Sequence, residues 1–243
     1  MSETKRVAVV TGASRGLGLV IARALGDRGY GLVINARDPN ALAGAAGELG
    51  HSAPAVRRVA GDITDASTRM AVIEAARGMG AGLDVLVNNA SELGGIGPLV
   101  TFDERRFSRL FPVNVGAPLA LIQLAAPLMR GRPGLIVNIT SDAATAAYAG
   151  WGPYGAAKAA LELLTRTLAA ELRDEGIAAV LVDPGDMRTR MHQEAFPGED
   201  ISDRPLPEAT LGFWNWLFDQ HPADISGLRF AAQQEDPRWV QQA

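Results

Sequence analysis

Short runs of apolar, mostly β-branched residues recur along the chain and alternate with longer segments that mix apolar and polar positions. Six of these runs lie at Arg6–Val10, Gly31–Ala36, Ala55–Val59, Leu83–Asn88, Leu135–Thr140 and Ala178–Val182, and a weaker one lies at Leu228–Ala231. Runs that are apolar at consecutive positions are typical of strands that are buried on both faces of a parallel sheet. The pattern therefore predicts six such strands and a weaker seventh.

The segments between these runs have helical periodicity, and Asp38, Asp65 and Asp103 stand at or shortly before the start of three of them, where Asp is a common helix cap. They lie at Gly18–Arg28, Ala41–Leu49, Ala66–Gly78, Asp103–Met129 and Tyr154–Glu175. Strands that alternate with helices predict an α/β fold, a single doubly wound parallel sheet with helices on both faces. The length of 243 residues suits one domain over residues 1–243. Within it, the aperiodic segment Asp186–Pro207 is predicted to be a substrate lid.

Composition and charge narrow the classes of partner. The formal net charge is −4 and the basic residues are scattered, so we expect neither a nucleic-acid nor a membrane partner. The first apolar run is only as long as a strand, which predicts a cytoplasmic protein without a signal peptide. The chain has no cysteine and only three histidines, which lack ligand-like spacing, so we expect no metal site.

A glycine-rich turn, TGASRGLG, directly follows the first predicted strand. Glycines let the backbone bend sharply there, and the N–H groups and dipole of the next helix attract a pyrophosphate. Such turns also occur for purely steric reasons, but the first strand–helix connection of a doubly wound sheet is where dinucleotides bind. The predicted cofactor contacts in this turn are Gly12, Ser14, Arg15, Gly16, Leu17 and Gly18.

The second predicted strand ends next to Arg37, where an acidic residue would accept hydrogen bonds from the adenosine ribose of NAD. A guanidinium binds phosphate oxygens through paired charged hydrogen bonds, so Arg37 and Arg15 suit the ribose 2′-phosphate of NADP. The alternative is that both arginines are solvated surface charges. Asp38, one residue further, is interpreted as the cap of the next helix. The sequence thus favours NADP as the cofactor.

Two further strand ends add candidate contacts to the adenosine. Asp62 and Ile63 follow the third predicted strand, and Asn88, Asn89 and Ala90 close the fourth. Parallel strands deliver the residues at their carboxyl ends to one edge of the sheet, so we expect these residues, apart from Asn88, at the cofactor. Taken alone, Asp62 and the asparagine pair would be interpreted as turn residues that satisfy their own backbone.

Tyr154 and Lys158 lie four residues apart on a predicted helix, so their side chains share one face. An unperturbed tyrosine has a pKa near 10, and a neighbouring ammonium is expected to bring the pKa of this phenol toward neutrality. The phenol can then exchange a proton with a carbonyl oxygen. Lys5 and Lys158 are the only lysines, so a chance Tyr-x-x-x-Lys pair is rare in such a chain.

Two more polar residues complete the predicted catalytic set of Asn114, Ser141, Tyr154 and Lys158. Ser141 follows the fifth predicted strand, so its hydroxyl can reach the same cleft and polarise a substrate carbonyl. An isolated serine after a strand is more often a turn or cap residue. Asn114 lies among apolar neighbours in the fourth predicted helix, where an amide needs a partner. We interpret it as the holder of a water that relays protons near Lys158.

These motifs resemble the short-chain dehydrogenase/reductase family over essentially the whole chain. They are TGASRGLG, Asn88-Asn89-Ala90, Asn114, Ser141, Tyr154-x-x-x-Lys158 and Pro184-Gly185, in the order and spacing of the family. The resemblance implies a Rossmann-type sheet and hydride transfer with nicotinamide. It also implies that Ser141 polarises the carbonyl, Tyr154 is the acid or base, and Lys158 anchors the ribose and modifies the pKa. The further cofactor contacts that it implies are Tyr154, Lys158, Pro184, Gly185 and Thr189.

Two departures from the family pattern concern its details. Ser91 replaces the glycine that usually follows Asn-Asn-Ala, and the tail after Gly227 lacks the common glycine-rich ending.

The helix predicted over Tyr154–Glu175 is apolar around much of its circumference, which indicates a second partner besides the sheet. Together with the resemblance, this predicts a homo-oligomer, specifically a tetramer.

The sequence therefore predicts an NADP(H)-dependent oxidoreductase that interconverts a carbonyl and a secondary alcohol. A partly apolar substrate with polar ends would suit three loops that carry Leu93, Ile96, Trp151, Met187, Phe196, Arg188, Arg190 and His192. A non-catalytic NADP-binding sensor or scaffold, an NAD-dependent alcohol dehydrogenase, and an epimerase or dehydratase remain open alternatives, because a fold alone does not exclude them.

Overall fold

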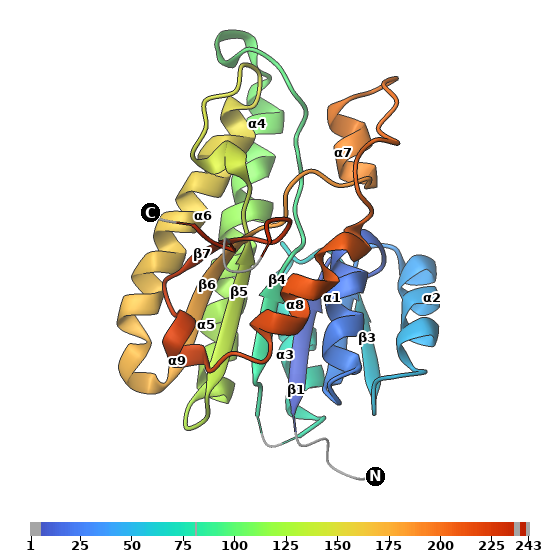
Figure 1. Ribbon diagram of the computed structural model, residues 1–243, viewed down its shortest axis with the longest axis vertical. Coiled ribbons are helices and arrows are strands. Elements are labelled where there is room, and N and C mark those ends of the chain that lie inside the picture. The colour runs from blue at the N-terminus through green and yellow to red at the C-terminus, as the bar shows by residue number, and fades with distance from the viewer. Residues whose placement is uncertain (1–5, 81, 236–238, 242–243) are drawn as a thin grey trace.

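The computed structural model of the protein describes residues 6–80, 82–235 and 239–241. Within these residues, one sheet has the strand order β3-β2-β1-β4-β5-β6-β7-β8, with β1 to β7 parallel and β8 antiparallel to β7 (Figure 1). The strands are β1 (Val7–Thr11), β2 (Gly31–Ala36), β3 (Val56–Ala60), β4 (Val85–Asn88), β5 (Gly134–Ile139), β6 (Ile177–Asp183), β7 (Arg229–Ala231) and β8 (Val240–Gln241). The predicted doubly wound parallel sheet is confirmed, and the weak seventh run is strand β7.

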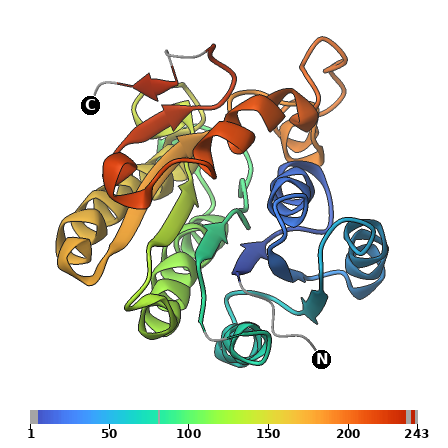
Figure 2. The ribbon, with the colours of Figure 1, turned by 60° about the horizontal axis from the view of Figure 1, so that its bottom comes forward.

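Helices cover both faces of this sheet (Figure 2). They are α1 (Gly16–Gly26), α2 (Pro39–Leu49), α3 (Ala66–Arg77), α4 (Glu104–Phe111), α5 (Ala117–Met129), α6 (Gly152–Glu171), α7 (Arg190–Ala195), α8 (Leu211–Leu217) and α9 (Pro222–Ile225). Successive residues of a strand point to opposite faces, so an unbroken apolar run fills two cores. In β1, Ala8 and Val10 pack with α1, α2 and α8, whereas Val7 and Val9 pack with α3 and α5.

The helix predicted over Asp103–Met129 is interrupted. It consists of α4, a π-helical turn over Pro112–Gly116, and α5, which begins at Ala117. Pro112 has no N–H, so it cannot donate a helical hydrogen bond. Its carbonyl oxygen accepts from the amide of Ala117, five residues further along, which is the hydrogen bond of a π-helical turn. Such π turns are frequent at functional sites, and Asn114 lies within this one.

By length and hydropathy alone, one helical stretch of the described residues, Glu104–Met129, could cross a membrane. Its apolar residues Leu121, Ile122 and Ala125 are buried in the core against α3 and the sheet. A buried core helix can be as apolar as a membrane span, so burial in the core accounts for the apolar composition of this stretch.

Two other helices differ from the prediction near the cleft. Helix α6 begins at Gly152 rather than Tyr154, because Pro153 suits a first helical turn, where its missing N–H costs nothing. The aperiodic segment Asp186–Pro207 contains α7, which was not predicted and which Thr189 caps by accepting a hydrogen bond from the amide of His192. In Figure 1 this segment stands above the carboxyl ends of the strands.

Candidate active site

The carboxyl ends of the parallel strands open into a cleft of about 620 Å³ beside the glycine turn. The predicted cofactor contacts that line it are Gly12, Ser14, Arg15, Gly16, Leu17, Gly18, Arg37, Asp62, Ile63, Asn89, Ala90, Tyr154, Lys158, Pro184 and Thr189. Gly185 lines a smaller adjoining pocket instead. The structure therefore brings the predicted cofactor residues together at one edge of the sheet.

Glycine is required in the turn because the backbone there approaches its neighbours closely. A Cβ atom on Gly12, whose φ is +65°, would lie 2.8 Å from the side-chain nitrogen Nδ2 of Asn89, and one on Gly18 would lie 2.4 Å from the carbonyl oxygen of Gly12. Asn89 Nδ2 donates to the carbonyl oxygen of Thr11 at 2.9 Å, and Thr11 Oγ1 accepts from the amides of Asn89 and Ala90 at 3.0 Å each. Asn89 thus braces the turn, together with Thr11, which the sequence analysis did not single out.

Helix α1 begins at Gly16, and its capping residue, Arg15, makes no hydrogen bond from its side chain to the helix. The first N–H groups of a helix need acceptors, and here they adjoin the cleft. An uncapped helix N-terminus behind a tight glycine turn fits the diphosphate of a dinucleotide.

The two predicted phosphate-binding arginines line the same cleft, beside the cap of α2. Arg15 Nη2 lies 3.9 Å from Asp38 Oδ2, and the two side chains are 51% and 52% exposed. Asp38 accepts hydrogen bonds from the amides of Asn40 and Ala41, so its predicted capping role is confirmed. Arg15 and Arg37 therefore line the same cleft, and the carboxylate of Asp38 lies near Arg15 there.

Asp62 forms a turn as well as lining the cleft. Its Oδ1 accepts hydrogen bonds from the amide and the hydroxyl of Thr64, at 2.9 and 2.8 Å. Burial alone would raise the pKa of Asp62, but these hydrogen bonds and the nearby charge of Arg37 lower it overall. The carboxylate is therefore charged at neutral pH and faces the cofactor cleft in that form.

Tyr154 and Lys158 lie on one face of α6, as predicted, and are almost fully buried. Lys158 Nζ lies 5.6 Å from the centre of the Tyr154 ring and donates a hydrogen bond to the carbonyl oxygen of Ile139 at 2.8 Å. The ammonium is thus held between the tyrosine and the end of β5.

The pKa of Tyr154 moves in the direction opposite to the sequence-based expectation. Burial raises the pKa of Tyr154 to about 12, and the carboxylates of Asp183 and Asp142 add to the rise, while the hydroxyls of Ser91 and Ser141 oppose it. Burial also lowers the pKa of Lys158 to about 8. The expectation of a near-neutral phenol is therefore wrong in this structure, because desolvation by burial is the largest influence on the phenol.

The lowered pKa of Lys158 predicts how stability depends on pH. Between about pH 8 and the ordinary value of 10.5, the unfolded chain binds more protons at this lysine than the folded chain, so stability rises with pH. Lys158→Met removes this dependence. From about pH 7 to about pH 10, we expect wild type to gain about 2 kcal/mol of unfolding free energy relative to Lys158→Met, measured in urea. A difference that stays constant with pH would contradict the lowered pKa of Lys158.

Ser141 lies beside Tyr154 and also caps a short turn. Its Oγ accepts a hydrogen bond from the amide of Ala143 at 3.2 Å and donates to Asp142 Oδ1 at 3.0 Å. Both Ser141 and Tyr154 line the smaller pocket. The two interpretations of this serine, as a cap and as a site residue, are therefore compatible.

Asn114 is buried in the π-helical turn, where its side chain contacts the segment after β4. Its Oδ1 accepts from Ser91 Oγ at 2.7 Å and from the amide of Glu92 at 3.1 Å, and its Nδ2 donates to the carbonyl oxygen of Glu92 at 2.8 Å. Ser91, which replaces the family's usual glycine, therefore lies between Asn114 and Tyr154. Its hydroxyl opposes the rise in the pKa of Tyr154. The role of Asn114 as a water holder stays a prediction.

The smaller pocket, of about 110 Å³, adjoins the cofactor cleft at Tyr154. Four of the expected substrate residues line it, namely Leu93, Trp151, Met187 and His192. Met191 and Ala195 of α7 also line it. Phe196 packs behind Trp151, with 6.1 Å between ring centres. Ile96 is 39% exposed and lies outside both cavities, whereas Arg188 and Arg190 line the cofactor cleft. The pocket is therefore less basic than the sequence suggested.

Comparisons with known proteins agree with this geometry. A family model described as short chain dehydrogenase matches residues 6–200. L-xylo-3-hexulose reductase of Hypocrea jecorina is 36% identical over 219 residues, which cover 79% of this chain and 70% of that protein. Sepiapterin reductase of Xenopus laevis is 34% identical over 200 residues, which cover 77% of this chain and 75% of that protein.

Solved structures share the whole fold. A short chain dehydrogenase of Pseudomonas syringae superposes with a TM-score of 0.89 at 30% identity and covers 95% of both chains. One from Shigella flexneri 2a, complexed with NADP, has a TM-score of 0.88 at 25% identity, covering 96% of this chain and 98% of that one. Sequence, fold and site agree, and the chain belongs to the short-chain dehydrogenase/reductase family of oxidoreductases.

Proposed function

We propose that the protein is an NADP(H)-dependent oxidoreductase that interconverts a carbonyl and a secondary alcohol, with Tyr154 as the general acid or base. The observation that carries the proposal is the place of Tyr154, which lines both the large cleft and the smaller pocket. A carbonyl compound in the pocket would meet the phenol on the side where the cofactor cleft begins. The nicotinamide, when bound, supplies or accepts the hydride.

Each polar group has a task in this reaction that its surroundings support. A phenol with a pKa of about 12 stays protonated at neutral pH and can donate its proton to a carbonyl oxygen. Ser141 can turn its hydroxyl from Asp142 toward the same oxygen. In the direction of oxidation Tyr154 must lose its proton. The hydroxyls of Ser91 and Ser141 favour the phenolate, and a charged Lys158, whose Nζ lies 5.6 Å from the centre of the ring, would favour it further.

The preference for NADP is proposed from Arg37 and Arg15, which line the cofactor cleft. Charged hydrogen bonds contribute about 1.5 to 3 kcal/mol each, so Arg37→Ala should weaken NADPH binding by about ten- to a hundredfold. NADH, which lacks the 2′-phosphate, should lose little affinity. The preference should also shrink as ionic strength rises, because both arginines are exposed to solvent.

Dissociation constants for both cofactors, at low and high salt, test this preference. Arg77→Ala is the matched control, because Arg77 is exposed, pairs with Glu74 and does not line the cleft. Equal losses of NADPH and NADH affinity in Arg37→Ala would show that Arg37 supports the adenosine or the fold rather than the phosphate.

The substrate we propose is a compact, partly apolar carbonyl compound without negative charge. The pocket combines apolar side chains such as Leu93 and Trp151 with the carboxylates of Asp142 and Asp186, and no Lys or Arg is among the described residues that line it. Residues 186–207 supply Met187, Met191 and His192, which supports the proposal that this segment is a lid.

A panel of neutral and anionic carbonyls and alcohols, assayed by the absorbance of reduced nicotinamide with NADPH and NADH, tests the function. Turnover of neutral ketones with NADPH supports the proposal. Tight NADPH binding without turnover of any compound would favour a non-catalytic sensor. Faster turnover with NADH would favour the NAD-dependent alternative.

We also propose a homotetramer. Leu163 on the outer face of α6 is 66% exposed, and Phe107 of the adjacent helix α4 is 40% exposed. An apolar helix face that the sheet does not cover is typical of a subunit contact. Light scattering at micromolar concentration should give four times the monomer mass, and Leu163→Glu should lower that mass. A monomer at this concentration would refute the proposal.

A further inference from the structure

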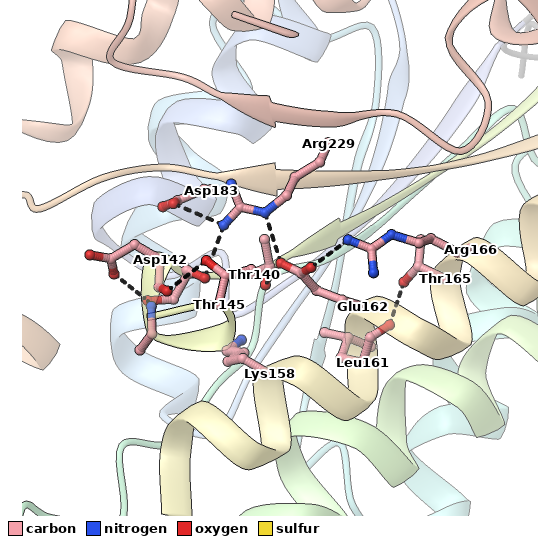
Figure 3. Close-up of polar contacts among 12 residues, drawn as sticks. Thr140, Asp142, Thr145, Lys158, Leu161, Glu162, Thr165, Arg166, Asp183 and Arg229 are labelled. Carbon is pink, nitrogen blue, oxygen red and sulfur yellow. Dashed lines mark hydrogen bonds and ion pairs between the residues drawn. The ribbon is translucent and has the colours of Figure 1, made fainter. Parts of the chain in front are cut away.

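Arg229 of β7 is a buried cation that contacts three elements of the active site (Figure 3). Its Nε donates to Glu162 Oε1 at 2.9 Å. Its Nη2 donates to Asp183 Oδ2 at 3.2 Å and to the carbonyl oxygen of Ser141 at 3.1 Å. The guanidinium thus joins the helix that carries Tyr154 to the strand end that carries Ser141.

The end of β5 is held to its neighbours by polar contacts at four successive residues. The pairs are Asn138 with Thr165, Ile139 with Lys158, Thr140 with Glu162 and Ser141 with Arg229, at distances of 2.8, 2.8, 2.8 and 3.1 Å. The first three partners lie on α6 and the last lies on β7. A shift of α6 along the sheet would break the first three contacts together, so they fix the position of α6 relative to β5.

Glu162 is the centre of this arrangement and is 2% exposed. It lies four residues after Lys158 on α6, so it follows the catalytic pair on one helix face. Its Oε1 accepts from Thr140 Oγ1 and Arg229 Nε, and its Oε2 accepts from Arg166, whose side chain is 39% exposed. The carboxylate therefore has one partner directly after β5, one on β7 and one at the surface.

The same guanidinium also reaches the turn after β6. Asp183 Oδ1 accepts a hydrogen bond from the amide of Gly185 at 3.0 Å, while its Oδ2 accepts from Arg229. Gly185 lines the smaller pocket, and Pro184 lines both cavities. Arg229 therefore contacts two segments that line the site, directly at Ser141 and through Asp183 at the turn of Pro184 and Gly185.

Net stability is a weak explanation for these charges. Desolvation offsets most of the attraction in a buried ion pair, and apolar residues of similar volume are often as stabilising. A guanidinium, however, presents its donors in one plane and in fixed directions, so it orients several acceptors at once. Arg229 and Glu162 are absent from the described residues that line either cavity, so an effect on the reaction must pass through their partners.

We propose that Arg229 and Glu162 are positioning residues, which set the separation of the Ser141 and Tyr154 hydroxyls through Thr140 and the carbonyl oxygen of Ser141. The proposal rests on the proposed function, in which both hydroxyls must reach one substrate oxygen. A misplacement of about 1 Å in such a site costs about a hundredfold in rate. The network in Figure 3 spans the two backbone segments that carry these hydroxyls.

A matched pair of substitutions at Thr140 tests the link between Glu162 and β5. Thr140→Val keeps the shape of the side chain but removes the hydroxyl that Glu162 accepts from, whereas Thr140→Ser keeps the hydroxyl. We expect Thr140→Val to lower kcat by about tenfold or more, with the NADPH dissociation constant nearly unchanged, and Thr140→Ser to retain most of kcat. Equal kcat values in the two variants would overturn the proposal.

A second pair tests the guanidinium. Arg229→Lys keeps the charge but cannot bind Glu162, Asp183 and the Ser141 carbonyl together, so kcat should fall by about ten- to a hundredfold. Arg166→Met removes the surface partner of Glu162 and should leave kcat near wild type. If Arg166→Met loses as much kcat as Arg229→Lys, or if losses follow the fall in melting temperature, the network is only structural and the proposal is overturned.

The two proposals fail in different ways. A wild-type protein that turns over no carbonyl or alcohol would overturn both. An active wild type whose Thr140→Val and Arg229→Lys variants fold and keep full kcat would overturn only the positioning role. If Arg229→Lys does not fold, the Thr140 pair decides the question, because Val and Thr have nearly the same volume.

Discussion

Tyr154→Phe should lower kcat by about three orders of magnitude while NADPH binds almost as tightly as to wild type. The substitution removes one oxygen atom from a buried ring, so the packing of the site is retained. Proton transfer by a positioned side chain contributes about a hundred- to ten-thousandfold to rate, and no other phenol lines the pocket among the described residues. The loss should therefore fall on the chemical step.

Tyr148→Phe is the matched control for this prediction. Tyr148 is 48% exposed and does not line the pocket, although its hydroxyl donates to Oδ2 of Asp142, which does, at 2.8 Å. The same chemical change there should cost less than about tenfold. Single-turnover kinetics with saturating NADPH separate the chemical step from binding. A folded Tyr154→Phe protein with turnover close to wild type would exclude Tyr154 as the acid.

Lys158→Arg should lower kcat by about a hundredfold or more although it keeps the positive charge. Lys158 is 2% exposed, and its ammonium donates to the carbonyl oxygen of Ile139 at 2.8 Å. A guanidinium is larger and planar, so it cannot occupy this space without moving α6 or β5. Kinetics and thermal melting of the purified variant check the prediction. A fully active Lys158→Arg enzyme would show that charge alone suffices and that the geometry of the ammonium is unimportant.

The strands were predictable because the sheet is covered on both sides. Short runs of consecutive apolar, β-branched residues such as Val7–Val10 are typical of strands buried on two faces. The helix interruption at Pro112–Gly116 and the short helix α7 were missed for a different reason. Each is only about one turn long, so no periodicity marks it, and its stability depends on contacts with distant segments.

The grouping of the candidate site residues was predictable because they lie at strand ends and on one helix face, where sequence position fixes spatial position. The pKa of Tyr154 was not, because its direction depends on how much water the fold removes from the phenol. The partners of Asn114 were equally hidden, since Ser91 and Glu92 reach it from another strand end. Arg229 was missed because its acceptors are 46 to 88 residues away along the chain.

The measurement that tests the central claim most directly is the transfer of deuterium to a neutral ketone from NADPH that carries deuterium in both positions at the nicotinamide C4 atom. If the protein is an NADP(H)-dependent oxidoreductase of the proposed mechanism, one deuterium should appear on the carbinol carbon of the product, detected by mass spectrometry. The Tyr154→Phe protein should form that product about a thousandfold more slowly. An alcohol product without deuterium, or labelled product formed equally fast by Tyr154→Phe, would contradict the account.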